Sequence, residues 1–162
     1  MYDGSYFAQV PLPYEPGQNQ VVLFDSVRNV TIQLVSDKVA AFTLGSHRFL
    51  RLRADSTVAL ATGFCELLVD GPTRLLARRT KTATKVVGGQ GIRGAHEPAP
   101  RFFVQRQNRY YPVVKLGQVL RVLADKKPEL QQFARSSQLR FRDASRAASL
   151  TQLLQCYAEL AR

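Results

Sequence analysis

Two histidines, His47 and His96, are the first residues to consider for chemistry, and neither has the partners that chemistry needs. His47 follows a predicted tight turn, and His96 lies in a glycine-rich segment. Neither has acidic or cysteine partners at the spacing of metal ligands. The sequence therefore predicts no metal site and no cofactor.

The two cysteines, Cys65 and Cys156, stand far apart in the sequence and in apolar surroundings. Neither has a second cysteine at metal-ligand spacing, so both are predicted to be buried free thiols rather than a disulfide pair. A nucleophilic Cys65 is the alternative. A cysteine inside a predicted strand beside Leu67, Val69 and Leu75 is more typical of the core.

The carboxylates Glu66 and Asp70 could form an acid–base pair. A simpler interpretation is that they complement Arg74 and Arg78 across a predicted hairpin, because opposite charges on facing strands attract. No residue pattern places a nucleophile or base beside a partner that would activate it. The sequence therefore predicts that the protein is not an enzyme.

A G-x-G-x-x-G motif at Gly89, Gly91 and Gly94 suggests a dinucleotide site. Such a site needs a helix to begin at the motif, so that its N-terminal amides meet the pyrophosphate. The prolines that follow prevent a helix there, and no strand–helix–strand unit surrounds the motif. We therefore expect a flexible glycine-rich loop over residues 81–100.

Charge is the strongest signal in the chain, which has 23 Lys and Arg against 12 Asp and Glu and a formal net charge of +11. Residues 1–70 hold five basic and seven acidic residues, residues 71–124 eleven and one, and residues 125–162 seven and four. The excess lies in the middle third. It indicates either a solvated face or a surface that meets an anionic partner.

Basic and aromatic residues are interleaved in this middle third, as on surfaces that bind single-stranded nucleic acid through phosphates and stacked bases. Anionic lipid head groups, an acidic glycan or a protein surface fit the same pattern. A solvated face with its aromatics in the core is the simpler alternative. The candidate partner-binding residues are Arg74, Arg78, Arg79, Lys81, Lys85, Arg101, Arg106 and Arg109, with Phe102, Phe103, Tyr110 and Tyr111 among them.

Predicted strands must position these residues. After a loose arm over residues 1–20, β-branched and aromatic content predicts four short strands. The dipeptide Gly45-Ser46 predicts a type II′ turn that pairs Thr43 with Arg48 and Phe42 with Phe49. The four strands cover residues 21–25, 30–35, 39–44 and 47–53.

A hairpin predicted over residues 63–80 turns at Asp70-Gly71-Pro72. A three-residue loop there would set Val69 opposite Thr73 and Leu67 opposite Leu75. One face of the hairpin would then mix apolar and charged residues. Those residues are Phe64, Glu66, Leu68, Arg74, Leu76 and Arg78.

Another hairpin is predicted over residues 101–114, around Gln107-Asn108. It would pair Val104 with Tyr111. It would also leave Arg106 and Arg109 at the tip.

From Lys115 the hydrophobic period changes from two to about 3.6, which predicts three short helices. They cover residues 116–123, a segment from Pro128 to about Ser136, and about 143–161 with Asp143 as N-cap. An antiparallel region of about six to nine short strands followed by three helices is an α+β fold.

Length and a hydrophobic content of 45% predict one domain over residues 1–162, divided into the arm, a β region to 114 and a helical region from 115. No apolar run approaches the roughly 20 residues of a membrane span. Residues 1–9 lack the basic patch and apolar stretch of a signal peptide. The chain as written is therefore expected to carry no transmembrane segment and no signal peptide.

Several segments resemble a family of uncharacterised exported proteins from Bacteroidota, and the resemblance covers about residues 12–160. They are Val21–Phe24, Val30–Val35, Asp37–Gly45, Gly63–Gly71, Leu75–Arg79, Tyr110-Tyr111 and Asp125-Lys126-Lys127.

The resemblance implies a structural or binding protein of the bacterial cell envelope, periplasmic or secreted, with no assigned activity. Its partner would be an anionic glycan, a lipid head group or a protein surface. The alternative is a cytoplasmic nucleic-acid-binding module that uses the same arginines on phosphates.

Overall fold

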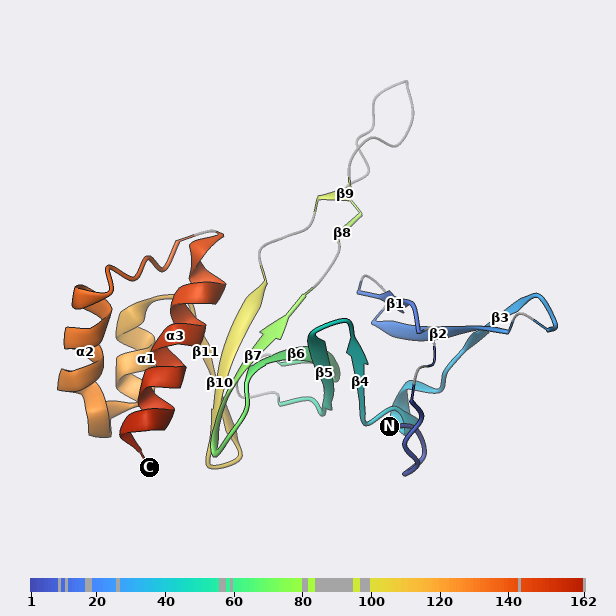
Figure 1. Ribbon diagram of the computed structural model, residues 1–162, viewed down its shortest axis with the longest axis horizontal. Helices are drawn as coiled ribbons and strands as arrows, with labels where there is room; N and C mark the ends of the chain where they lie inside the picture. The colour runs from blue at the N-terminus through green and yellow to red at the C-terminus, as the bar shows by residue number, and fades with distance from the viewer. Residues whose placement is uncertain are drawn as a thin grey trace, which may run out of the picture.

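In the computed structural model of the chain, eleven strands precede three α-helices among the described residues, which confirms the α+β class (Figure 1). Eight of these strands span four residues or more, and three span only two. No helix in the described part of the chain is long and apolar enough to cross a membrane. The structure describes residues 1–8, 10, 12–16, 19–25, 27–55, 58, 60–79, 82–83, 95–96, 100–142 and 144–161.

An antiparallel sheet of six strands, in the order β11-β10-β7-β6-β5-β4, forms the centre of the molecule. Each strand pairs with its neighbour in the chain, except that β8 and β9 come between β7 and β10. The strands are β4 (Ala41–Leu44), β5 (His47–Leu52), β6 (Gly63–Val69), β7 (Thr73–Arg78), β10 (Arg101–Arg106) and β11 (Arg109–Val113).

Turn residues set two of these hairpins as predicted. Gly45 has a φ of 56°, and β4 pairs with β5 through Phe42–Phe49 and Thr43–Arg48. At the tip of β10 and β11, Gln107 and Asn108 have φ values of 50° and 61°, as a type I′ turn requires. Val104 lies opposite Tyr111, so the predicted register of this hairpin is confirmed.

The register predicted for β6 and β7 is wrong. A bulge between Leu67 and Val69 sets Val69 opposite Leu75, and Leu67 opposite Leu76. The extra residue turns Val69 to the face of Leu75, where both join the core beneath the helices. Upstream of the bulge, Glu66 lies on that same face, opposite Ala77 and away from Leu76.

Three helices cover one face of the β7, β10 and β11 end of the sheet (Figure 1). They are α1 (Leu116–Val122), α2 (Lys127–Ser136) and α3 (Ser145–Leu160), with 3₁₀ turns at Ala124–Lys126 and, earlier in the chain, Ser36–Lys38. Leu130, Leu150 and Leu153 are fully buried against the sheet's Leu75 and Val104.

Three details of the helices bear on the predictions. Pro128 stands in the first turn of α2, as expected. Asp143, the expected N-cap of α3, lies outside the described residues, and Ala144 at the N-cap position provides no side-chain hydrogen bond. Leu160 is exposed at the end of α3, although its spacing from Leu153 and Tyr157 would place it on their side of the helix.

The same sheet face is covered at its β4–β6 end by a second sheet, β1-β2-β3. Its strands are β1 (Tyr14–Glu15), β2 (Gln20–Asp25) and β3 (Val30–Gln33). Tyr14 packs with Phe42, Phe49 and Phe64 at ring-centroid distances of 5.2, 5.2 and 6.0 Å. The expected loose arm over residues 1–20 is therefore docked in the part that the structure describes.

Asn19 joins the two sheets. Its Oδ1 accepts hydrogen bonds from Phe64 N at 2.9 Å and from Tyr14 Oη at 3.2 Å. Gly63 must be glycine here, because its φ is 146° and an added Cβ would lie 2.0 Å from the Asn19 side chain.

Most of the predicted glycine-rich loop lies outside the described residues, including Lys81, Lys85 and the G-x-G-x-x-G glycines. The described parts form a two-stranded antiparallel ladder between β8 (Thr82–Ala83) and β9 (Ala95–His96). This ladder brings the two sides of the segment together after β7 and before β10.

Candidate functional site

Arg74 and Arg78 share a face of β7, and both are engaged within the chain. Arg74 Nε donates to Asp70 Oδ1 at 2.9 Å. Arg78 donates to the carbonyl oxygens of Ala61 at 2.6 Å and Thr62 at 3.1 Å. Arg78 therefore holds the segment that leads into β6, and its removal would disturb the fold as well as any surface.

Arg79 reaches a carboxylate that is only 2% exposed, Glu66. Arg79 Nε lies 2.7 Å from Glu66 Oε2, and His47 Nδ1 lies 2.5 Å from Oε1. The predicted pairing of Glu66 with Arg74 or Arg78 does not form, because the β6–β7 register places Glu66 on the opposite face. Two hydrogen-bond partners thus compensate the burial of one carboxylate.

The His47–Glu66 contact resembles the carboxylate–imidazole pair that orients a catalytic base. Among the described residues, no serine or cysteine side chain is hydrogen-bonded to His47. The described part of the chain also holds no group of three metal-ligating side chains. The contact therefore serves to compensate the burial of Glu66.

Arg106, at the tip of β10, is bound to the helical layer. It donates to the Val122 carbonyl at 2.7 Å and to Asp125 Oδ1 at 2.9 Å, and it lies over the Tyr157 ring. Burial acts to raise the pKa of Asp125, but hydrogen bonds from Tyr157 and Arg106 outweigh it and hold the pKa below its ordinary value. Arg109, its neighbour across the turn, is exposed and has no ion pair with a described residue.

The aromatic residues of the predicted surface face inward. Phe102 and Phe103 are buried, and Tyr110 and Tyr111 are half-buried, so the two phenylalanines cannot stack on a nucleic acid base. Arg101 lies over the Phe103 ring with 5.5 Å between its guanidinium carbon and the ring centroid.

A different set of cations is exposed and makes no ion pair with a described residue. Most of them lie on or between the helices, and α2, which makes its main contacts with other helical elements, lies on the outside of that end of the molecule (Figure 1). Residues 109–142 hold eight Lys and Arg against two Asp and Glu. We call these side chains the helical cations: Arg109, Lys115, Arg121, Lys127, Arg135, Arg140 and Arg142.

Of the helical cations, only Arg109 is among the candidate partner-binding residues that the sequence predicts. That prediction rests on basic residues interleaved with aromatics on strands, whereas a charged outer face is typical of any solvated amphipathic helix. The charge count over residues 109–142 is the signal that could have found them.

Both cysteines are free, as predicted. Cys65 is fully buried, and burial raises its pKa to about 11 although Arg78 acts in the opposite direction. Cys156 is only half-buried, and burial raises its pKa as well. Neither thiol has the lowered pKa of a nucleophile.

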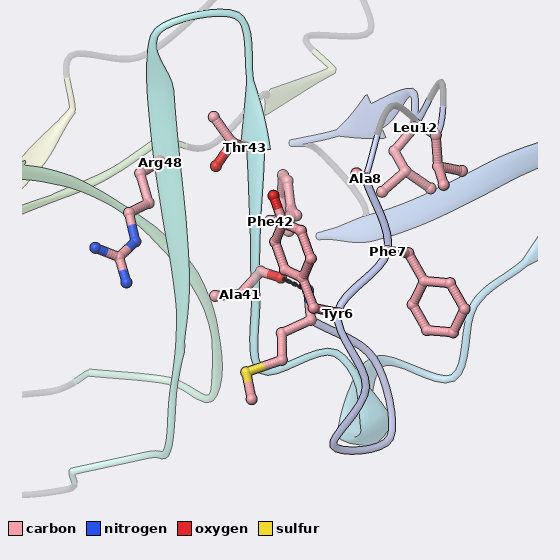
Figure 2. Close-up of a pocket in the computed structure, with 10 residues that line it drawn as sticks. Tyr6, Phe7, Ala8, Leu12, Ala41, Phe42, Thr43 and Arg48 are labelled. Carbon is pink, nitrogen blue, oxygen red and sulfur yellow. Dashed lines mark hydrogen bonds between the residues drawn. The ribbon is translucent and has the colours of Figure 1, made fainter.

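A hollow of about 320 Å³ lies between the N-terminal segment and β4 (Figure 2). Tyr6, Phe7 and Phe42 line the hollow, and Arg48 lies on the neighbouring strand β5, on the far side of β4. A neighbouring apolar hollow of about 270 Å³ shares Phe7 and Phe42 and adds Leu23. Ligand sites are commonly about 300–1,000 Å³ with convergent polar groups, so the second hollow, which is smaller and almost wholly apolar, suits an apolar side chain better than a cofactor.

Comparison of the chain with models of known protein families, with curated proteins and with solved structures finds no match.

Proposed function

We propose that the chain is a non-enzymatic binding protein that holds an anionic partner against the helical cations. The observation that carries this proposal is the contrast between two sets of basic residues. Arg74, Arg78, Arg79 and Arg106 already have internal partners. The helical cations are exposed without an ion pair to a described residue, so they can meet an anion without disturbing the fold.

The partner that we propose is an anionic glycan or the head groups of anionic lipids, in the bacterial cell envelope. The envelope location is drawn from the resemblance to exported proteins of Bacteroidota. Five of the seven helical cations are arginines, whose planar guanidinium groups can donate paired hydrogen bonds to sulfate, carboxylate or phosphate oxygens. Nucleic acid is the alternative, and the burial of Phe102 and Phe103 leaves it phosphate contacts without stacking from those two rings.

The test compares two triple variants of equal charge. Arg135→Ser/Arg140→Ser/Arg142→Ser removes three helical cations, and Lys38→Ser/Arg48→Ser/Arg53→Ser removes three exposed cations from the other end of the chain. The probes are heparin, vesicles containing phosphatidylglycerol, and a single-stranded oligonucleotide, each titrated at several salt concentrations.

The helical variant is expected to weaken binding to heparin or to the vesicles about tenfold or more and to flatten the salt dependence, because fewer counterions are released. The control is expected to bind within about twofold of the unmodified chain. Equal losses in both variants would show that only net charge matters and would contradict the proposed site. Binding confined to the oligonucleotide would favour the nucleic-acid alternative.

A further inference from the structure

Exposed apolar side chains are concentrated in the first 35 residues. Of the ten large hydrophobic residues that are exposed in the described part of the chain, eight belong to this stretch. Surface apolar residues scattered singly need no explanation, whereas a concentration marks an interaction surface. Those eight residues are Met1, Tyr6, Phe7, Phe24, Val27, Val30, Ile32 and Val35.

The β2–β3 hairpin extends away from the rest of the molecule (Figure 1), and β3 is its outer strand. All four residues of β3, Val30–Gln33, are exposed. Ile32 lies opposite Leu23, on the face that leads back to the buried Val21 and the apolar hollow. The apolar face of the hairpin thus extends past the part that other segments of the chain cover.

The outer edge of β3 offers regularly spaced backbone groups. Leu34 N donates to Val21 O at 3.0 Å, so Leu34 points its backbone groups toward β2. In an antiparallel ladder the bonded residues alternate, which turns the N–H and C=O groups of Thr31 and Gln33 outward. The edge lacks the lysine, proline or inward charge that protects most edge strands.

We propose that β3 is a dimerisation edge, at which two copies of this chain pair antiparallel about a two-fold axis. Thr31 of one copy would exchange two backbone hydrogen bonds with Gln33 of the other, and the symmetry would repeat that exchange. Ile32 would lie against its own counterpart at the axis. The sheets β1-β2-β3 of the two copies would then form one continuous sheet, with its apolar face shared.

Charge favours a second copy at this edge. Residues 30–35 carry no charge, and residues 1–35 hold one basic and three acidic residues in a chain of net charge +11. In the antiparallel register, Arg28 of one copy approaches Asp37 of the other. Arg28 is 78% exposed and 3.9 Å from Asp25, and Asp37 is 82% exposed although it contacts Arg51. Both are therefore accessible for a pair that forms twice.

Sedimentation equilibrium of the full chain tests this dimer independently of any anionic partner. A short strand interface is small, so we expect a monomer–dimer equilibrium with a Kd of about 10–100 µM. Thr31→Pro removes an outward N–H at an edge where proline is tolerated. It should weaken the dimer about tenfold or more, whereas the matched Thr31→Val, which keeps the N–H, should leave it within about twofold.

A charge exchange provides the second variant. Arg28→Asp should weaken the dimer several-fold, because it sets Asp25 and one new carboxylate of each copy near Asp37 of the other, and Arg28→Asp/Asp37→Arg should restore it. Circular dichroism of each variant checks that the fold persists. A monomer at every concentration up to about 1 mM, a dimer that Thr31→Pro leaves unchanged, or a double variant as weak as the single one would overturn the proposal.

Discussion

The two ends of the six-stranded sheet are covered on the same face and in different ways. By the observed register, Phe42, Phe49, Glu66 and Ala77 lie side by side on that face. Over β7, β10 and β11, three amphipathic helices close a core and leave cations outside. Over β4 to β6, a three-stranded sheet buries an aromatic cluster and leaves much of its own apolar surface exposed.

This difference separates stability from self-association within one small fold. A helix can bury a wide apolar stripe against a sheet and still present charge to solvent. A hairpin that extends past its support has nothing to bury against. The helical end should therefore carry most of the stability, and the N-terminal sheet should tolerate substitution and take part in association.

The largest expected effect is a loss of stability at the helical end, and its absence would contradict the comparison of the two ends. Leu153→Ala, in the core beneath the helices, should lower the free energy of unfolding by about 3 kcal/mol, because it removes a fully buried side chain and leaves a cavity. Ile32→Ala, on the exposed β3, should lower it by less than about 0.5 kcal/mol. Urea unfolding of both variants, at concentrations too low for a dimer, measures the difference. Similar losses in the two variants would mean that the ends contribute alike.

An effect of intermediate size concerns Glu66, which lies on the covered sheet face between Phe49 and Ala77. Glu66→Gln should lower the free energy of unfolding by about 1–2 kcal/mol, because it weakens hydrogen bonds from both Arg79 and His47 at a buried site. Arg109→Gln, which removes one exposed cation, is the control and should change stability by less than about 0.5 kcal/mol. A Glu66→Gln variant with unchanged stability would show that the contacts of Glu66 with Arg79 and His47 do not stabilise the fold.

The smallest expected effect sharpens the account of the helical end. The pKa of Asp125 is lowered in the fold, so its contribution is present above the ordinary aspartate pKa and is lost as pH falls through the folded value. Asp125→Asn should therefore lower stability by less than about 1 kcal/mol at pH 7, since the pair with Arg106 is partly exposed. The stability of the Asp125→Asn variant should also fall less steeply between about pH 5 and pH 2 than that of the unmodified chain. Thermal unfolding of both proteins across that range measures how steeply the stability of each falls with pH. Equal slopes would contradict the role assigned to Asp125.

Local residue chemistry was enough to predict many elements. Gly45 and Asn108 are residue types that favour the positive φ values of their turns, and the registers of both hairpins were predicted correctly. The helical period gave all three helices within a few residues. The β6–β7 register was missed, because Asp70-Gly71-Pro72 permits more than one loop and burial of Val69 under the helices favours the bulge.

The sequence by itself determined the fold class, the turns at Gly45-Ser46 and Gln107-Asn108, the free cysteines and the excess of positive charge, because each depends on composition or on neighbours in the chain. Tertiary structure alone decided which arginines are engaged. Arg79 meets Glu66 across two strands, and Arg106 meets Asp125 between a strand and a 3₁₀ turn, contacts whose partners stand 13 and 19 residues away. Pairing of charges depends on distances in space, and those are set only when strands and helices pack.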